Sequence, residues 1–117
     1  MLLNDSVNKI SVFGGTGFVG SEFCKQFSDQ IVLMNRDAVL PITKKVLYLI
    51  STVDNYNVLT DPYVDINTNL THLMKVLENC KNTDVEFTFV SSWFVYGETD
   101  LPARENSVCN PRGFYSI

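Results

Sequence analysis

A glycine-rich turn between an apolar run and an amphipathic segment limits this chain more than any other feature of its sequence. Residues 9–13 are predicted to form a short buried strand, and residues 17–28 carry apolar side chains at the four-residue spacing of a helix face. Gly14 permits a tight turn out of the strand, Gly17 lets a phosphate approach the backbone, and Gly20 lets the helix pack close to the sheet. Because the helix N-terminus also offers N–H groups, the segment predicts a site for the diphosphate of a dinucleotide.

The rest of the chain continues the alternation of strands and helices. Four short and nearly continuous apolar runs are predicted to be strands: residues 9–13, 31–34, 46–50 and 87–90. Such runs are typical of parallel strands that are covered on both faces. With helices predicted at 17–28 and 64–81, the order favours one domain over residues 1–117. Its expected fold is α/β and Rossmann-like, with three layers around a truncated parallel sheet of about four strands in the order 2-1-3-4.

The connection between the second and third predicted strands is short. It has about 11 residues, which is near the lower limit for a crossover that contains a helix. Pro41 also disfavours helical backbone at the residue before it. We therefore expect an irregular loop or one short turn in this connection, and an uncovered edge at the strand 31–34.

The helix predicted at 64–81 carries an apolar stripe that we expect to face the sheet. Its members recur at 4-3-4-3 spacing: Ile66, Leu70, Leu73, Leu77 and Cys80. Met74 and Val76 add apolar surface on other sides. Two alternatives stay open, a helix buried entirely within this chain or one that also meets a second subunit in a homodimer. His72, the only histidine, is expected to be solvated or to cap the helix.

Composition and charge exclude several classes of function. The chain is 45% hydrophobic with a net charge of −4, so it lacks the basic face of a nucleic-acid binder. No run of Lys or Arg indicates a membrane surface, and no apolar stretch reaches the ~20 residues of a membrane helix. The N-terminus lacks the pattern of a signal peptide, and the three cysteines lack metal-binding spacing. We expect a cytoplasmic protein with reduced thiols and no metal.

The residues after the second predicted strand bear on the choice of dinucleotide. An acidic residue there binds the ribose 2′-hydroxyl of NAD, whereas an arginine accommodates the 2′-phosphate of NADP. Asn35 stands in the place of the acid, and Arg36 follows it. Arg36 either pairs with a phosphate or lies solvated over the adenine. NAD and NADP therefore both stay open, with NADP slightly favoured.

Further motifs resemble one family over nearly the whole chain. Residues 89–97 read Phe-Val-Ser-Ser-Trp-Phe-Val-Tyr-Gly, and an earlier strand ends in the small residues Ser51 and Thr52. With the glycine turn, these motifs resemble the extended short-chain dehydrogenase/reductase family, the NAD(P)-dependent epimerases and dehydratases that act on nucleotide sugars. The resemblance implies the following cofactor-binding residues: Gly14, Gly15, Thr16, Gly17, Phe18, Val19, Gly20, Asn35, Arg36, Ser51, Thr52 and Asn67.

The resemblance also implies catalytic roles. Ser92, four residues before the Tyr-Gly pair, would hold the reacting hydroxyl, and Tyr115 would be the general acid/base. The phenol of a tyrosine titrates near about pH 10 unaided, and the family supplies a lysine four residues after it. This chain ends at Ile117, before that lysine. Trp93 and Phe94 replace the Asp-Glu pair of the sugar 4,6-dehydratases, which disfavours that branch.

Two functions remain open at this point. The first is the N-terminal part of an NAD(P)-dependent nucleotide-sugar epimerase, dehydratase or reductase, which transfers a hydride at a sugar carbon and whose C-terminal substrate domain is absent. The second is a non-catalytic dinucleotide-binding or interaction module. The context of Ser92 and Tyr115 favours the enzyme as the origin, and the missing lysine predicts that this chain is inactive alone.

Overall fold

A four-stranded parallel sheet forms the centre of the molecule. The computed structural model describes residues 8–53, 59–98 and 102–112. In chain order, the strands are β1 (Ile10–Phe13), β2 (Ile31–Leu33), β3 (Lys45–Tyr48) and β4 (Glu86–Phe89). They lie side by side in the order β2-β1-β3-β4, and each neighbouring pair is parallel. The predicted α/β fold and strand order are confirmed.

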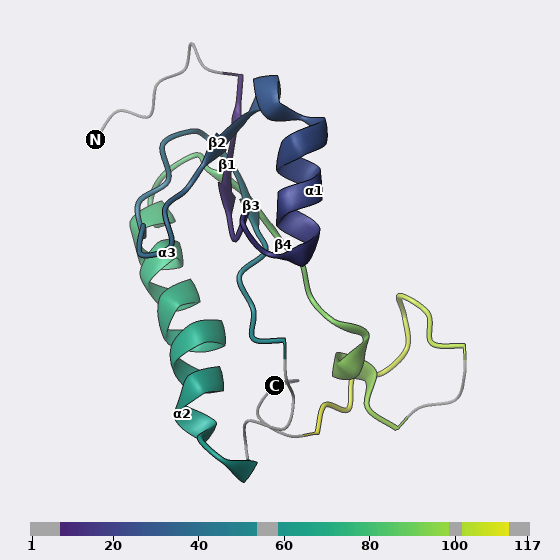
Figure 1. Cartoon of the computed structure of the whole chain (residues 1–117). Coiled ribbons are helices and arrows are strands. Elements are labelled where there is room, and N and C mark those ends of the chain that lie inside the picture. Colours follow the sequence, from purple (N-terminus) through teal and green to yellow (C-terminus); the bar gives the residue numbers. More distant parts are fainter. Residues whose placement is uncertain (1–7, 54–58, 99–101, 113–117) are drawn as a thin grey trace.

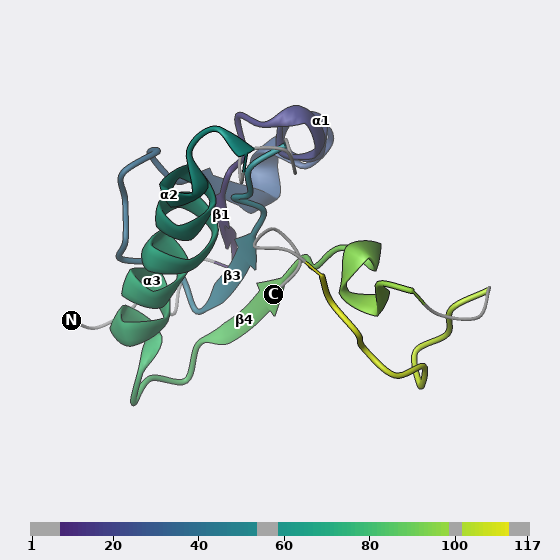
Figure 2. The same ribbon diagram turned by 90° about the horizontal axis from the view of Figure 1, so that it is seen from below.

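Helices lie on both faces of this sheet, as the two views in Figures 1 and 2 show. One face carries α1 (Phe18–Gln26), which a short 3-10 turn, Ser28–Gln30, follows. The other face carries α2 (Pro62–Asp65) and α3 (His72–Cys80), with a π-helical segment, Ile66–Thr71, between them. In Figure 1 these three segments run on as one continuous helix, which we call the long helix.

The long helix begins at a strong start signal. Asp61 is its N-cap, and the Asp61 side chain accepts a hydrogen bond from the backbone N–H of Tyr63 at 3.0 Å. Pro62 occupies the first position, where its fixed φ suits a helix and its missing N–H costs nothing. The helix therefore starts two residues before the predicted bound of 64. It ends at Cys80, and Asn82 then turns the chain with φ +58°.

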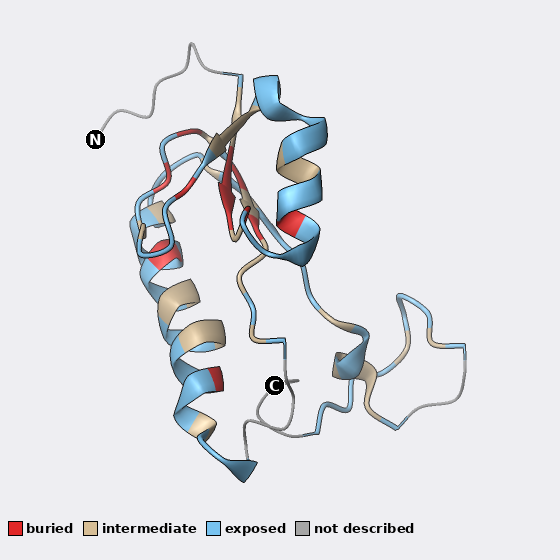
Figure 3. Cartoon of the chain, viewed as in Figure 1, coloured by how far each residue is buried: buried red, intermediate tan, exposed pale blue. Residues whose placement is uncertain are grey.

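The long helix does not bury the stripe that the sequence pattern predicts. Three members of that stripe are exposed by more than a third: Ile66, Leu70 and Leu77. Asp65 and Val76 are buried instead, and Asn69 is half-buried, as the colours along this helix in Figure 3 show in outline. A π turn holds more residues than an α turn, so the helical period shifts within Ile66–Thr71. The predicted stripe was therefore wrong for Ile66, Leu70 and Leu77, whereas its other members, Leu73 and Cys80, are partly buried against the core.

The main core lies between the sheet and the long helix. Its buried members come from β1, from β3, from the residue that follows β2 and from the long helix: Phe13, Met34, Val46, Tyr48 and Val76. The connection 34–44 contains no helix or strand, as predicted, and one turn in which the N–H of Ala38 donates to the Asn35 carbonyl at 3.0 Å. Asn79 ties this connection to α3 by donating its Nδ2 hydrogen to the Val39 carbonyl at 3.1 Å.

Candidate functional site

The glycine turn joins β1 to α1 through a hydrogen-bonded loop. Gly14 has φ +81°, a backbone conformation that residues with side chains rarely adopt. The N–H of Gly17 donates to the Gly14 carbonyl at 3.1 Å, and Gly17 is the N-cap of α1. No side chain caps this helix end. The start of α1 therefore presents its N–H groups outward, which is the arrangement that binds a phosphate.

Two glycines of the turn allow backbone segments to meet closely. A Cβ atom on Gly14 would lie 2.8 Å from the backbone nitrogen of Ile50, just beyond β3. A Cβ atom on Gly20 would overlap the Gly14 carbonyl and lie 2.8 Å from the Cα of Gly15. At Gly17 the nearest atom would be the Gly14 carbonyl oxygen at 3.3 Å. Gly14 and Gly20 are therefore required by packing, whereas Gly17 faces a more open space.

A cleft of about 900 Å³ lies at the carboxyl ends of the strands. The glycine turn, the end of β3, the long helix and the end of β4 all contribute to its lining. The predicted site residues in this lining are Gly14, Gly17, Phe18, Val19, Gly20, Ser51, Thr52 and Ser92. Ligands of open α/β sheets bind in the crevice outside the carboxyl ends of the strands. The fold thus brings these residues together in the place where such a ligand binds.

The remaining predicted site residues lie elsewhere. Gly15 is buried behind the turn, where a Cβ atom would lie 2.7 Å from the Cys24 sulfur. Four others are exposed and do not contribute to the lining: Thr16, Asn35, Arg36 and Asn67. Tyr115 lies outside the described residues.

A polar network that the sequence analysis missed lies in the wall of the cleft. The Thr52 hydroxyl donates to Oδ1 of Asp65 at 2.6 Å and accepts from Nδ2 of Asn69 at 2.9 Å. The Thr52 N–H donates to Oδ1 of the same Asn69 at 2.7 Å. Asp65 and Asn69 stand four residues apart, which was the available signal that both face one side of the helix. Asn69, and not Asn67, is the asparagine of the long helix that lines the cleft.

Ser92 lies at the end of β4, where the 3-10 turn Trp93–Tyr96 begins. Its hydroxyl accepts a hydrogen bond from the N–H of Phe94 at 3.3 Å, so the side chain caps this turn. The rings of Trp93 and Phe94 stack with their centroids 4.8 Å apart, and Trp93 is 65% exposed. Ser92 therefore lines the cleft, and a local hydrogen bond holds its hydroxyl.

A second polar contact lies in the core, below the cleft. The hydroxyl of the fully buried Tyr48 forms a hydrogen bond of 2.9 Å with Nδ1 of His72. Burial raises the pKa of Tyr48 to about 12. His72 is half-buried, and its Nε2 atom has no hydrogen-bond partner among the described residues. The expectation of a solvated or capping histidine was therefore wrong, because Tyr48 draws the ring toward the sheet.

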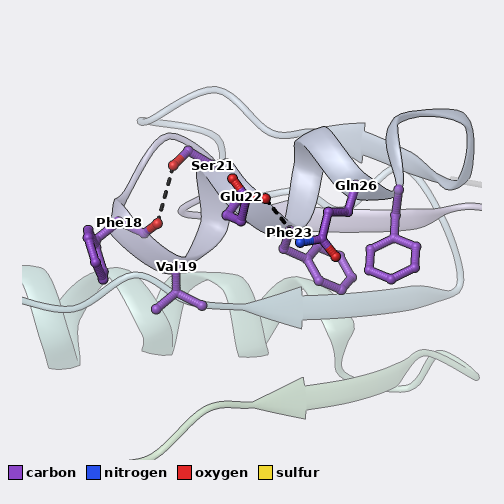
Figure 4. Close-up of a pocket in the computed structure, with 7 residues that line it drawn as sticks. Phe18, Val19, Ser21, Glu22, Phe23 and Gln26 are labelled. Atoms are coloured by element: carbon purple, nitrogen blue, oxygen red, sulfur yellow. Dashed lines mark hydrogen bonds between the residues drawn. The ribbon is translucent and has the colours of Figure 1, made fainter.

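A second hollow of about 600 Å³ lies along α1 and shares Phe18 and Val19 with the cleft (Figure 4). Its polar side chains pair with one another or with the helix: Gln26 donates to Glu22 at 3.0 Å, and Ser21 donates to the Phe18 carbonyl at 3.2 Å. The predicted site residues with hydroxyl side chains in these linings, Ser51, Thr52 and Ser92, line the larger cleft and not this hollow.

Two further observations concern the described residues only. None of their helices combines the length and the apolar character that crossing a membrane requires. Within the same ranges, no group of three or more His, Cys, Asp or Glu side chains is arranged to hold a metal ion. The three cysteines are free thiols, with Cys109 exposed.

Comparison with known proteins finds similarity in structure. No protein-family model and no curated protein matches the sequence. UDP-N-acetylglucosamine 4-epimerase from Methanobrevibacter ruminantium, solved with UDP-N-acetylmuramic acid, matches 93% of this chain with a TM-score of 0.80 and 21% identity. UDP-glucuronic acid 4-epimerase from Bacillus cereus, solved with NAD, matches 92% with a TM-score of 0.76 and 19% identity. RMD from Pseudomonas aeruginosa, complexed with NADPH, matches 93% with a TM-score of 0.75 and 22% identity.

These matches define the fold and its extent. The chain covers 46%, 47% and 44% of the three solved chains, so it spans less than half of their length. At these levels of identity the likeness establishes the Rossmann-like α/β fold.

Proposed function

We propose that this chain is the dinucleotide-binding N-terminal part of an NAD(P)-dependent enzyme that modifies nucleotide sugars by hydride transfer at a sugar carbon. The observation that carries the proposal is the cleft at the carboxyl ends of the strands, which joins the glycine turn, the end of β3 and Ser92. Solved structures with this fold include nucleotide-sugar epimerases, one of them in complex with NAD. The residue-level resemblance to the extended short-chain dehydrogenases/reductases points the same way.

The glycine turn fits the diphosphate of such a cofactor. The start of α1 has no side-chain cap, and Gly17 leaves room beside the backbone that a larger residue would fill. Phe18 and Val19 line the cleft next to this position, with Phe18 95% exposed. The turn would bind the diphosphate through backbone N–H groups, which explains why its glycines and not charged side chains carry the site.

The carboxyl end of β4 would carry the reacting part of the substrate. A bound nicotinamide dinucleotide would accept or return a hydride at its nicotinamide ring. We propose that the Ser92 hydroxyl holds the reacting oxygen of the sugar by a hydrogen bond. We further propose that Tyr115, which lies outside the described residues, exchanges the proton of that oxygen as general acid/base. The sugar nucleotide itself is identified only as a class.

Arg36 bears on which dinucleotide binds. It is exposed just beyond β2, the strand whose end meets the adenine ribose in folds of this type. We propose a slight preference for NADP, through pairing of Arg36 with the 2′-phosphate. Arg36→Ala would then weaken NADPH binding by about tenfold and leave NADH binding within about twofold.

Binding measurements test the proposed function directly. Calorimetry with NADH and NADPH should give dissociation constants in the micromolar range or weaker, because the short connection 34–44 provides little cover for adenine. Gly17→Val, which fills the space for the phosphate, should weaken binding by about tenfold or more. Gln26→Ala, in the hollow along α1, is the matched control and should bind as the unchanged chain does.

Three outcomes would separate the alternatives. Failure of both dinucleotides to bind at millimolar concentration would refute the proposed function. Binding that Gly17→Val does not weaken would move the site away from the glycine turn. Turnover of a nucleotide sugar by a longer chain that includes the lysine after Tyr115, and its loss in Ser92→Ala, would distinguish the enzyme from a non-catalytic dinucleotide-binding module.

A further inference from the structure

The network around Thr52 joins the long helix to the end of β3. Asn69 holds Thr52 at two points, since its Oδ1 accepts from the Thr52 N–H and its Nδ2 donates to the Thr52 hydroxyl, at 2.7 and 2.9 Å. The same hydroxyl then donates to Asp65, which is 1% exposed, at 2.6 Å. Because the Thr52 N–H can only donate, it must face Oδ1 of Asn69, and this fixes the orientation of the Asn69 amide.

The contact lies at the π-helical segment of the long helix. Asn69 lies within Ile66–Thr71, and Asp65 is the last residue before it. Segments of this kind interrupt the α-helical period and are frequent at functional sites. Asp65 and Asn69 both bond to Thr52 after the end of β3, while Leu70 is 55% exposed.

The segment that Asn69 holds is the one against which the glycine turn packs. The N–H of Leu49 donates to the Phe13 carbonyl at 2.9 Å, which continues the β1–β3 pairing to the start of the turn. Gly14 then lies so close to the Ile50 nitrogen that a Cβ atom would be only 2.8 Å away. Any shift of residues 49–52 would therefore move the contact surface of Gly14, because there is no flexible side chain between the two backbones.

We propose that Asn69 is a positioning residue: by holding Thr52 it fixes the end of β3 and, through that backbone, the place of the glycine turn in the cleft. The proposal rests on the proposed function for its effect on a dinucleotide, but its structural part can be tested without a ligand. Asn69 acts through Thr52 and Gly14, and it requires no contact of its own with the bound molecule.

Hydrogen exchange of the whole chain tests the structural part. Asn69→Leu removes the amide at similar volume. It should raise the exchange rates of the Thr52 and Gly17 amides by about tenfold or more, because both lose the support of the β3 end. Asn79→Leu is the matched control, since Asn79 lies on the same long helix and donates only to the Val39 and Lys75 carbonyls. It should leave both amides unchanged. Equal exchange of the Gly17 amide in Asn69→Leu and the unchanged chain would overturn the proposal.

Dinucleotide affinity tests the functional part. Asn69→Leu and Thr52→Val, which removes the shared hydroxyl, should each weaken NADH or NADPH binding by about fivefold or more. Thr52→Ser, which returns the hydroxyl, should recover most of this loss. Asn79→Leu should lower the melting temperature without changing the dissociation constant. A loss of affinity that follows melting temperature equally in Asn69→Leu and Asn79→Leu would show a merely structural role and overturn the proposal. If the unchanged chain binds neither dinucleotide, the proposed function fails, and the exchange experiment still decides the role of Asn69.

Discussion

The connection that enters the outer strand β2 and the connection that leaves it cover the sheet in different ways. The first, residues 14–30, runs from β1 to β2 and contains the glycine turn, α1 and a 3-10 turn. The second, residues 34–44, runs from β2 to β3 without any helix or strand. In the first connection, the helix satisfies most of its own backbone N–H and C=O groups. The second connection has no helical ladder beyond the single turn at Asn35 and Ala38, so its buried backbone groups at Ile42 and Thr43 need partners from outside.

A pair of buried hydroxyls supplies these partners. The Ser11 hydroxyl, in the middle of β1, accepts from the N–H groups of Ile42 and Thr43 at 3.1 and 3.0 Å. The Thr43 hydroxyl accepts from the Ser11 N–H at 2.9 Å and donates to the Lys45 carbonyl at 2.8 Å. Both side chains are at most 1% exposed. Two small polar residues thus do for the extended connection what an internal hydrogen-bond ladder does for α1.

The two connections also differ in whether they line the cleft. The first connection contributes five residues to the cleft, namely Gly14, Gly17, Phe18, Val19 and Gly20, whereas no residue of the second connection lines it. The first turn of a helix offers unpaired N–H groups to a ligand. In the second connection, the N–H groups of Ile42 and Thr43 already donate to the Ser11 hydroxyl. We infer that the shorter connection serves stability.

The largest effect is expected at the packed end of the first connection. Gly20→Ala should destabilise the chain by more than about 3 kcal/mol or prevent folding, because its Cβ would overlap the Gly14 carbonyl within a rigid turn. Gly17→Ala is the matched control, since its Cβ would lie 3.3 Å from the same oxygen, and it should lose much less stability than Gly20→Ala. Urea denaturation measures both. A Gly20→Ala protein as stable as Gly17→Ala would contradict the close packing of α1 on the turn.

A pH-dependent effect is expected on the face that the second connection shares with α3. Burial raises the pKa of Tyr48 to about 12, against about 10 in an unfolded chain. The folded state disfavours the phenolate, so the neutral Tyr48 contributes to the free energy of unfolding. This contribution is fully present below about pH 10. It is lost as the pH rises toward about 12 and amounts to about 2–3 kcal/mol.

Two substitutions isolate this contribution. The stability of Tyr48→Phe should fall less steeply between about pH 10 and pH 12 than that of the unchanged chain, in urea denaturation at a series of pH values. Tyr63→Phe is the control, because Tyr63 is 68% exposed and its substitution should leave the slope as it is. Parallel slopes for Tyr48→Phe and the unchanged chain would show that the phenol is not shielded from water.

A somewhat smaller effect is expected where the second connection is anchored. Thr43→Val keeps the shape of the side chain but removes the hydroxyl, which leaves the buried N–H of Ser11 without its acceptor. The expected loss is about 1–3 kcal/mol in the free energy of unfolding, with dinucleotide affinity unchanged. Thr43→Ser retains the hydroxyl and should lose much less. A loss of affinity in Thr43→Val at full folding would remove the distinction between the supporting and the ligand-binding connection.

The parts of this fold that depend on nearby residues were predicted from the sequence. The glycine turn, the strands and the helix-free connection follow from apolar runs, glycines and Pro41, whose effects act within a few residues. The pairing of Ser11 with Thr43 was not predicted, because it joins positions 32 residues apart and depends on the register of β1. Local patterns contain no information about such a partner.

The cleft likewise combines features that nearby residues predict with features that depend on distant partners. Its glycines and strand ends were foreseen, whereas the inward face of the long helix was assigned to Ile66 and Leu70 and not to Asp65 and Asn69. A helical periodicity argument places apolar residues on the inward face. It does not predict that hydrogen bonds to Thr52 offset the cost of burying the two polar side chains. Tertiary partners, together with the π-helical segment, reversed the assignment.

The smallest effect is expected at the exit of the second connection. Nζ of Lys44 lies 2.8 Å from the Asp84 carboxylate, and this hydrogen bond lowers the pKa of Asp84. The contribution is therefore present above the ordinary pKa of an aspartate and is lost as the pH falls through the lowered value. Because the Asp84 side chain is 71% exposed, Asp84→Asn should lower the melting temperature by a few degrees at most, and by less in high salt.

A matched substitution shows whether charge or backbone holds this exit. The N–H of Glu86 also donates to the Lys44 carbonyl at 2.8 Å, and that bond survives the loss of Asp84. Asp29→Asn, in the exposed 3-10 turn of the first connection, removes the same charge without that lysine. If Asp84→Asn lowers the melting temperature no more than Asp29→Asn does, the backbone bond alone anchors the exit. If Asp84→Asn lowers the melting temperature as far as Thr43→Val does, the exposed ion pair contributes as much as the buried hydroxyls. The connection is then held from its surface as well as from inside.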